Sequence, residues 1–213
     1  MRGYRIHLIA CGKAEQAEGS LYLGRLDPSL TPEGRSHLAE LKLAYTYPFV
    51  QRVYSSPLRR CKETAEFLYP DEKIFIDDGL TELDTGIFTG KQISWLKGNM
   101  YFQDFMKNGL DYEIPEGEAG ADFVARCIAS YQNIFENMIR DQMRDVAVVT
   151  HPGVILCLLS AMGVPKFDAK QLLLPPGTGW TTYITPEMWM RSRAFEIFEP
   201  LPCAEPEEEP EEE

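Results

Sequence analysis

The sequence predicts an α/β fold: three layers, with a mostly parallel central sheet between helices on both faces. Short runs rich in β-branched or aromatic residues alternate with amphipathic helical patterns along the chain. Within one of these runs, Ala147–Val149 is continuously apolar, as expected of a strand that is covered on both sides. The length of 213 residues, 44% of them hydrophobic, suits one domain with a sizeable core.

Six strands and four helices justify this prediction in chain order. The strands are expected at Arg5–Ile9, Arg52–Ser55, Ile74–Ile76, Val146–Thr150, Thr181–Ile184 and Ala194–Phe198. The first helix begins at Thr31, a capping residue followed by Pro32 at the first helical position. The others are expected at Pro57–Tyr69, Val124–Met138 and Gly153–Met162, with apolar residues at steps of three and four.

Two segments depart from the regular alternation. Residues 80–117 carry Trp95, Tyr101, Phe102 and Phe105, which predict either a helical lid or flank over the site, or ordinary packing. Residues 203–213 are almost exclusively Pro and Glu and cannot bury apolar surface, so they are expected to form a disordered acidic tail. We therefore expect one domain over residues 1–202.

Charge and hydropathy exclude several classes of partner. Of the net charge of −12, seven negative charges belong to glutamates beyond Ala204, which leaves −5 for the body of the protein. No surface for nucleic acid or anionic membrane is expected from this balance. No run of about 18 apolar residues predicts a membrane span. Met1–Tyr4 leads straight into a strand with no room for a signal peptide, so a cytoplasmic location is expected.

Polar or reactive residues follow three predicted strands, near Ala10, Ser55 and Thr150. In parallel sheets, ligands bind outside the carboxyl ends of the strands. The run Ser55–Arg60 combines a helix start with an arginine that can clamp a phosphate, and His151 ends a buried-looking strand. Taken singly, an arginine, a histidine or Glu82 at such places is more often a surface or structural residue.

The order of these segments resembles that of the histidine phosphatase superfamily, which includes the cofactor-dependent phosphoglycerate mutases. The resemblance spans residues 4 to about 185 and rests on six segments in register: Ala10-Cys11-Gly12, Leu30–Gly34, Ser55–Arg60 with Thr64-Ala65, Glu82 with Gly86 and Gly90, Pro115–Glu118, and Thr150–Gly153. Within the superfamily, Gly19–Gly24 and Gly179-Trp180 resemble segments of the α-ribazole phosphatases.

The resemblance implies phosphoryl transfer from a small phosphate ester, α-ribazole phosphate among the candidates. Cys11 would stand at the nucleophile position, and Gly12, Arg60 and the Ala10 position would hold the phosphate. His151 would stabilise the phosphate charge, and Glu82 would act as general acid and base. No cofactor and no metal are implied. In agreement, the histidines His7, His37 and His151 show no ligand spacing and the five cysteines include no Cys-x-x-Cys pair.

The first two residues of the Arg-His-Gly motif depart from the superfamily pattern. Ala10 replaces a phosphate-binding arginine, and loss of one preorganised donor typically costs ~10² to 10³ in rate. Cys11 replaces the nucleophilic histidine with a shorter side chain, and a displacement of about 1 Å can cost ~10²-fold. Ala17 and Lys13 also stand where many members have asparagine and glutamate.

Four hypotheses remain open at this point. In the first, the chain is a phosphomonoesterase impaired by Ala10 and Cys11, which were introduced into a natural Arg-His sequence. In the second, it is a natural pseudophosphatase that binds a phosphorylated ligand or partner. In the third, it is a phosphatase with a cysteine nucleophile, since a thiolate accepts phosphoryl groups and Arg60 and His151 would lower the pKa of Cys11. A redox sensor would pair Cys11 with Cys61. The sequence does not indicate an oligomeric state.

Overall fold

The computed structural model describes residues 3–14, 21–167, 172 and 174–204. Its main sheet has seven strands in the order β4-β3-β5-β1-β7-β8-β6. β4, β3, β5 and β1 run parallel to one another, β7 is antiparallel to β1 and β8, and β6 is parallel to β8. The strands are β1 (Tyr4–Ala10), β3 (Arg52–Ser55), β4 (Ile74–Ile76), β5 (Asp145–Thr150), β6 (Gly163–Val164), β7 (Gly179–Ile184) and β8 (Phe195–Leu201).

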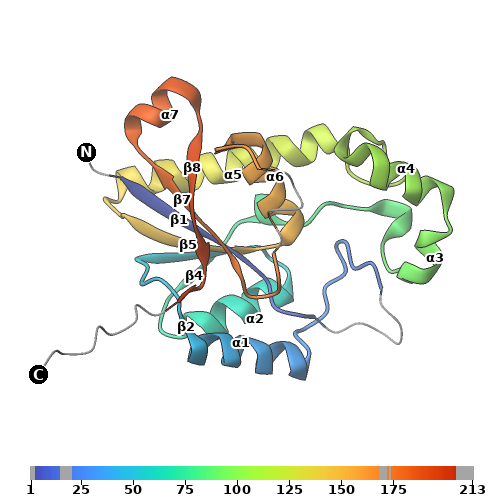
Figure 1. Cartoon of the computed structure of the whole chain (residues 1–213), viewed down its shortest axis with the longest axis horizontal. Coiled ribbons are helices and arrows are strands. Elements are labelled where there is room, and N and C mark those ends of the chain that lie inside the picture. The colour runs from blue at the N-terminus through green and yellow to red at the C-terminus, as the bar shows by residue number, and fades with distance from the viewer. Residues whose placement is uncertain (1–2, 15–20, 168–171, 173, 205–213) are drawn as a thin grey trace, which may run out of the picture.

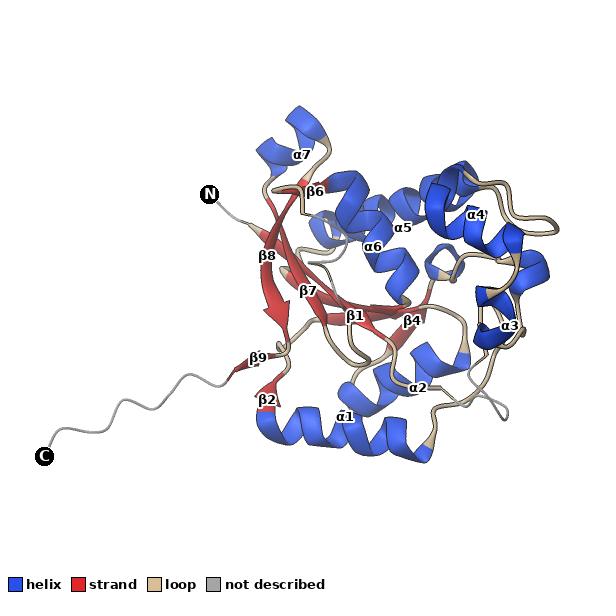
Figure 2. Ribbon diagram, turned by 45° about the vertical axis from the view of Figure 1, so that its right-hand side comes forward, coloured by secondary structure: helices blue, strands red, loops and turns tan. Residues whose placement is uncertain are grey.

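Helices cover both faces of this sheet, so the predicted three-layer α/β fold with a mostly parallel sheet is confirmed. In Figures 1 and 2, α1 and α2 lie on one face and α5 and α6 on the other, while α3 and α4 extend beyond the sheet beside α5. The helices are α1 (Pro32–Ala44), α2 (Arg59–Leu68), α3 (Ile93–Lys97), α4 (Met100–Asn108), α5 (Gly120–Arg140), α6 (Pro152–Met162) and α7 (Pro186–Ser192).

The two faces of the sheet form two separate parts of the core. In β1, Leu8 and Ala10 belong to the cluster under α5 and α6, whereas Ile9, and Cys11 just after the strand, belong to the cluster under α2. The same alternation divides the apolar residues of β5 between the two faces. Because side chains alternate along a strand, both faces of β1 and β5 must be apolar, which explains their uninterrupted hydrophobic runs.

The predicted boundaries agree closely with the observed ones. β3 and β4 have the predicted limits. The Thr31 side chain accepts a hydrogen bond from the Gly34 N–H at 2.8 Å, and Pro32 opens α1, as the capping pattern indicated. α2 starts at Arg59 rather than at Pro57, because Leu58 is still extended (φ −70°, ψ 140°). The short helix α7, capped by Thr185 with Pro186 in its first turn, was not predicted.

The prediction of a disordered tail from residue 203 is wrong for its first two residues. Cys203–Ala204 form β9, which pairs antiparallel with β2 (Tyr45–Thr46). Backbone pairing with an edge segment needs no apolar side chains, so composition alone did not reveal it. Residues 205–213 lie outside the described residues, as do Ala17, Gly19 and Ser20.

Residues 80–117 contain α3, α4 and two single-turn 3-10 helices, Gly86–Phe88 and Gly109–Asp111. Phe102 and Phe105 are buried, and Phe102 makes edge-to-face contacts with Tyr22 and Phe88 at ring distances of 5.4 and 5.3 Å. Trp95 and Tyr101 are half exposed. Two of the four predicted aromatic residues therefore anchor this segment to the domain, and two face solvent.

Candidate active site

A cavity of about 1040 Å³ lies at the carboxyl edge of the parallel strands. It brings together Cys11, Gly12, Arg60, Glu82 and His151, which come from four segments far apart in the sequence. The turns after β1 and β5 and the start of α2 supply most of them, because the carboxyl ends of parallel strands meet at one edge. The remaining predicted site residue, Ala10, does not line the cavity.

Ala10 lies on the other face of β1, in the core under α5 and α6, and has no exposed surface. Its N–H donates to Thr178 O at 2.8 Å, and its carbonyl accepts from Gly177 N at 3.0 Å. The position therefore offers the cavity neither a charge nor a free hydrogen-bonding group.

The turn after β1 is held by contacts from two other elements. Cys11 N–H donates to Thr150 O at 2.8 Å, and Gly12 N–H donates to Thr64 Oγ1 at 2.9 Å. A Cβ at Gly12 would lie 3.0 Å from the side chains of Leu30 and Leu38, so a larger residue would crowd this turn. Gly12 thus fits the space, but its N–H already has a partner in α2.

Arg60 is buried beside the cavity, at 4% exposure. Its Nη1 and Nη2 donate to the carbonyls of Leu26 and Gly24, which fixes the guanidinium and the loop before α1. A guanidinium has five N–H donors, and among the residues that the structure describes three of those of Arg60 have no hydrogen-bond partner.

His151 is the N-cap of α6 and has no exposed surface. Its Nε2 lies 2.8 Å from Ser56 Oγ, and its Nδ1 lies 3.8 Å from Cys11 Sγ and 3.6 Å from Cys61 Sγ. Ser56 and Cys61 are contacts that sequence spacing did not assign to the phosphate site. The sequence suggests Cys61 only as a redox partner of Cys11, and in the fold both thiols lie against the His151 ring.

The environment of the two thiols pushes their pKa values apart. A hydrogen bond from the Cys61 thiol, helped by His151 and Arg60, lowers the pKa of Cys11 well below its ordinary value, against the effect of burial. Burial, followed by the neighbouring Cys11, raises the pKa of Cys61. Cys11 is therefore the thiol of the pair that ionises first.

Glu82 reaches the cavity from the loop after β4. Its Oε1 accepts from Leu83 N at 2.9 Å and its Oε2 from Gly153 N at 3.3 Å. A Cβ at Gly153 would lie 2.2 Å from Glu82 Oε1, so glycine in the first turn of α6 makes room for this carboxylate.

Arg126 and Glu118 hold the loop that carries Glu82. Arg126 makes five hydrogen bonds, two to the Glu118 carboxylate and three to the carbonyls of Gly79, Thr81 and Glu82. Burial works against the Glu118 charge, but the Arg126 bonds hold the pKa of this carboxyl below its ordinary value. Glu118 belongs to a segment that carried the resemblance, whereas Arg126 gave no sequence signal.

The rest of the cavity wall is mostly apolar. It includes Leu83 after β4, Phe105 of α4, Phe123 and Val124 of α5, and Leu156 of α6. Burial, with a contribution from Glu82, raises the pKa of Tyr22 at this wall to about 12, so its phenol stays neutral. The cavity thus combines one polar end with a large apolar end.

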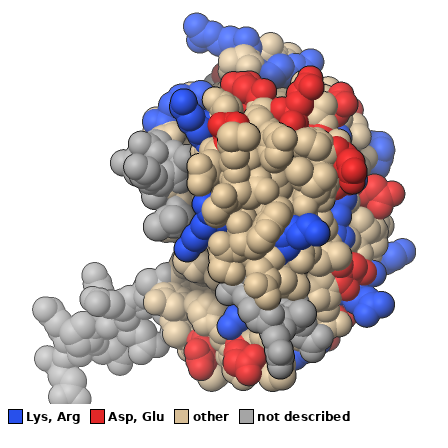
Figure 3. All heavy atoms as spheres, turned by 90° about the vertical axis from the view of Figure 1, so that its right-hand side faces the viewer, with Lys and Arg blue, Asp and Glu red and all other residues tan. Residues whose placement is uncertain are grey.

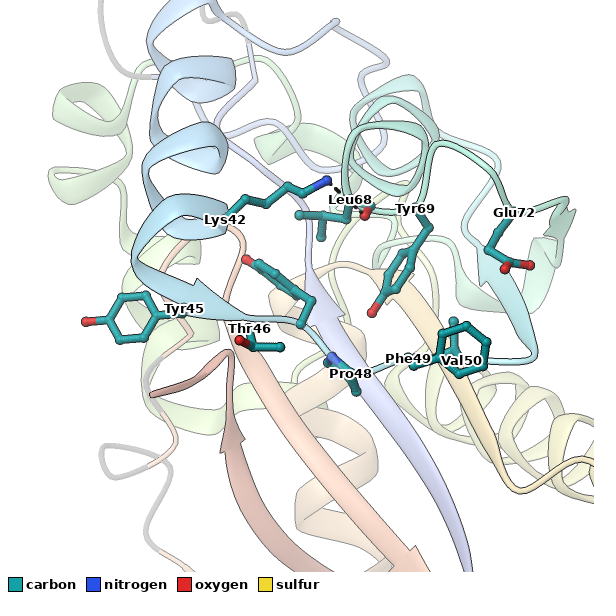
Figure 4. Close-up of a pocket in the computed structure, with 10 residues that line it drawn as sticks. Lys42, Tyr45, Thr46, Pro48, Phe49, Val50, Leu68, Tyr69 and Glu72 are labelled. Carbon is teal, nitrogen blue, oxygen red and sulfur yellow. Dashed lines mark hydrogen bonds between the residues drawn. The ribbon is translucent and has the colours of Figure 1, made fainter. Parts of the chain in front are cut away.

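A second cavity of about 360 Å³ lies between α1 and the region around β2 and Tyr69 (Figure 4). It contains none of the predicted site residues, and Lys42 Nζ at its edge donates to the carbonyls of Phe67 and Leu68. Burial raises the pKa of the Tyr69 phenol, which has no hydrogen-bond partner among the residues that the structure covers.

One face of the molecule shows how the charged side chains of the protein body are distributed. Figure 3 shows the α3–α4 end of the molecule, where basic and acidic side chains are interspersed around a broad uncharged area. Within the ranges that the structure covers, no helix combines the length and hydropathy needed to cross a bilayer.

Sequence relatives include proteins named as phosphatases. A provisionally named phosphoserine phosphatase 2 of Hydrogenobacter thermophilus is 27% identical over 167 residues, 75% of this chain and 80% of its own length. A broad-specificity phosphatase of Saccharomyces cerevisiae is 24% identical over 177 residues, 80% of this chain and 75% of its own length.

Solved structures show the same fold. The α-ribazole phosphatase of Shigella flexneri superposes with a TM-score of 0.65 at 19% identity, covering 85% of this chain and 90% of its own. A phosphoglycerate mutase of Bacillus anthracis superposes with a TM-score of 0.71 at 18% identity and covers 92% of each chain. The profile of the histidine phosphatase superfamily (branch 1) matches residues 6–186. On these matches, the chain belongs to the histidine phosphatase superfamily.

Proposed function

We propose that the 1040 Å³ cavity binds a small phosphate monoester, and that this chain turns the ester over weakly. The observation that carries the proposal is the convergence of Cys11, Arg60, Glu82 and His151 on one cavity that is otherwise apolar. α-Ribazole phosphate is one candidate substrate, because structural neighbours include α-ribazole phosphatases.

The phosphate would lie at the polar end, between Arg60 and His151. Within the described part of the chain, Arg60 has three N–H donors beyond its two backbone bonds, enough for a bidentate contact with a phosphate. Lys13 also lines the cavity and adds a second positive charge. These groups support anion binding without the arginine that Ala10 replaces.

The organic part of the ester would lie against Phe105, Phe123 and Leu156. A wall of this kind favours an alcohol with an apolar or aromatic surface, since burying that surface contributes about 25 cal/mol per Å². Glu82, fixed by Gly153 N–H and the Arg126 network, would protonate the leaving oxygen.

Weak turnover follows from the two substituted positions. The Ala10 methyl lies in the core under α5 and α6 and stabilises no phosphoryl charge. Removal of one such donor costs ~10² to 10³ in rate. The Cys11 side chain lines the cavity but is shorter than that of histidine, so its sulfur would stop short of the place that an imidazole nitrogen would reach.

A second candidate function is hydrolysis with Cys11 as nucleophile, and the lowered pKa of Cys11 favours it. The thiolate would attack phosphorus and form an S–P bond as the ester oxygen leaves with a proton from Glu82. Water, deprotonated by Glu82, would then attack phosphorus and cleave the S–P bond, releasing phosphate and the Cys11 thiolate and leaving Glu82 protonated again.

Hydrolysis of p-nitrophenyl phosphate separates these candidates. The assay compares the chain with Ala10→Arg/Cys11→His, Cys11→Ser, and Cys203→Ser, a control thiol outside the cavity. We expect weak or no turnover by the chain and a gain of at least ~10²-fold in the double variant.

Two other results would change the assignment. Turnover by the chain that disappears in Cys11→Ser but persists in Cys203→Ser establishes the cysteine nucleophile. Absence of turnover in both the chain and the double variant, with phosphate binding retained, leaves a pseudophosphatase. Absence of phosphate binding as well refutes a phosphate site in this cavity.

A further inference from the structure

Two buried thiols lie next to each other at the base of the cavity. Cys11 Sγ and Cys61 Sγ lie within 4.8 Å of each other, and both lie equally near a ring nitrogen of His151. Among the described residues that line the cavity, Cys11 is present and Cys61 is not. A molecule in the cavity would therefore meet the Cys11 sulfur, whereas Cys61 would reach that sulfur from the protein side.

Different elements hold the two thiols in place. Cys11 directly follows β1, and its N–H donates to Thr150 O at 2.8 Å. Cys61 lies in the first turn of α2, directly after Arg60. The pair therefore arises from the packing of α2 against the sheet. A disulfide needs about 2.05 Å between the sulfurs, so the two side chains would rotate toward each other to form one.

The two thiols differ in the way that a nucleophile and a second, resolving thiol differ. The hydrogen bond from Cys61, with His151 and Arg60, keeps the pKa of Cys11 low, so Cys11 is the ionised sulfur. Burial first, and then the neighbouring Cys11, raise the pKa of Cys61. Once the Cys11 sulfur is bonded to another atom and has lost its charge, the second of these causes disappears and Cys61 ionises more readily.

The same cavity carries groups that suit a tetrahedral oxyanion. Arg60 and Lys13 supply positive charge, and Glu82 supplies a carboxyl group. Thiols do not reduce phosphate. Arsenate has the shape and charge of phosphate, but its arsenic accepts two electrons and becomes trivalent. Two thiols supply two electrons when they form a disulfide, so a thiol pair beside an oxyanion site matches arsenate.

We propose that this chain reduces arsenate to arsenite, with Cys11 as the attacking sulfur and Cys61 as the resolving thiol. The inference rests on the anion site of the proposed function, but it does not depend on hydrolysis of an ester. The placement of the thiols supports it, because a nucleophile attacks sulfur from the side opposite the leaving group. Arsenic would lie on the cavity side of Cys11, and Cys61 lies outside the cavity lining.

The first step forms a bond between the Cys11 sulfur and arsenic. The Cys11 thiolate attacks arsenic, and one arsenate hydroxyl leaves as water with the proton of the Glu82 carboxyl.

The second step forms the disulfide. The Cys61 sulfur attacks the Cys11 sulfur, and its thiol proton passes to the departing arsenite. The electron pair of the S–As bond stays on arsenic, which is thereby reduced from the pentavalent to the trivalent state. In sum, one dihydrogen arsenate ion and two thiols give one dihydrogen arsenite ion, one disulfide and one water.

The test is a single turnover of the full chain, reduced, freed of reductant and kept without oxygen. Arsenate is added, arsenite is measured by ion chromatography, and free thiols are titrated. We expect one arsenite per chain and the loss of two of the five thiols, with a peptide that joins Cys11 to Cys61. Excess phosphate should slow the reaction, and phosphate in place of arsenate should leave all five thiols free.

Variants identify the two sulfurs. Cys11→Ser and Cys61→Ser should each lose arsenite formation, whereas Cys61→Ser should still bind inorganic phosphate in calorimetry, because Cys61 is not among the described lining residues. Cys157→Ser is the matched control, since this thiol of α6 also lines the cavity. It should form arsenite like the unaltered chain. Circular dichroism verifies that each variant is folded.

The possible failures are distinguishable. Phosphate binding without arsenite formation overturns the inference and leaves the proposed phosphate site intact, whereas absence of phosphate binding as well refutes both. Arsenite formation that Cys61→Ser leaves unchanged, or that Cys157→Ser abolishes, overturns the roles given to Cys11 and Cys61. So does a Cys11–Cys61 disulfide that hydrogen peroxide produces and arsenate does not.

Discussion

Replacing Arg126 by methionine tests whether the loop that carries Glu82 depends on one side chain. The change keeps the length of the aliphatic stem and removes all five hydrogen bonds that Arg126 makes to Glu118 and to the carbonyls of Gly79, Thr81 and Glu82. The Glu118 carboxylate, at 14% exposure, would then lose its bidentate partner and keep Arg25, whose Nη2 lies 2.9 Å from Oε2.

The expected loss of stability follows from this loss of partners. Leaving a buried charge without any partner costs about 3 to 5 kcal/mol, and the remaining Arg25 contact with the partial exposure of Arg126 (21%) places the cost below that range, about 2 kcal/mol. For a domain of this size, each kcal/mol lowers the melting temperature by about 2 to 4 °C, so a decrease of about 4 to 8 °C is expected.

Thermal unfolding followed by circular dichroism and urea unfolding at pH 7 measure the effect. The matched control is Arg140→Met in the same helix, where the arginine is 68% exposed and bonded to the adjacent Asp141. A surface pair of this kind contributes about 0.5 kcal/mol or less. The reasoning is refuted if Arg126→Met unfolds at the same temperature as Arg140→Met.

The remaining predictions concern pH, the active-site carboxylate and one core hydrogen bond. Burial, opposed in part by Asp145, lowers the pKa of His7 to about 4, so the unfolded chain binds more protons between pH 6.5 and 4. Stability should therefore fall by up to about 3 kcal/mol as the pH drops through this range, and His7→Gln should flatten the curve in urea titrations at several pH values. Gly153→Ala should leave the melting temperature within a few degrees. It should also displace Glu82 and lower p-nitrophenyl phosphate turnover of the Ala10→Arg/Cys11→His chain ~10²-fold, and equal turnover would contradict the role given to Gly153. Tyr131→Phe removes the 2.6 Å hydrogen bond to Thr182 and should cost about 1 kcal/mol in urea unfolding, whereas no change would mean that the bond contributes nothing.

Much of the fold could be predicted from the sequence because the information is local. The strand at Arg52–Ser55 and the cap at Thr31 depend on the residues themselves and their immediate neighbours, and both appear where the pattern placed them. α7 carries an equally local signal, Thr185 followed by Pro186, which the prediction overlooked. β9 differs, because its strand character exists only through pairing with β2.

The order of motifs along the chain also predicted which residues would share one cavity. Cys11, Gly12, Arg60, Glu82 and His151 were all expected at one edge of the sheet, and all five line one cavity. Parallel topology explains this success, since it brings the carboxyl ends of separate strands together regardless of the loops between them.

The sequence by itself determined the alternation of strands and helices and the set of reactive residues at one edge of the sheet. Only the tertiary structure decided that Ala10 faces α5 and α6 while Cys11 faces Cys61, and that Arg126 holds the Glu82 loop. The physical reason is that propensity and periodicity act over a few residues. Contacts between residues 44 to 140 positions apart depend instead on how the helices pack across the sheet.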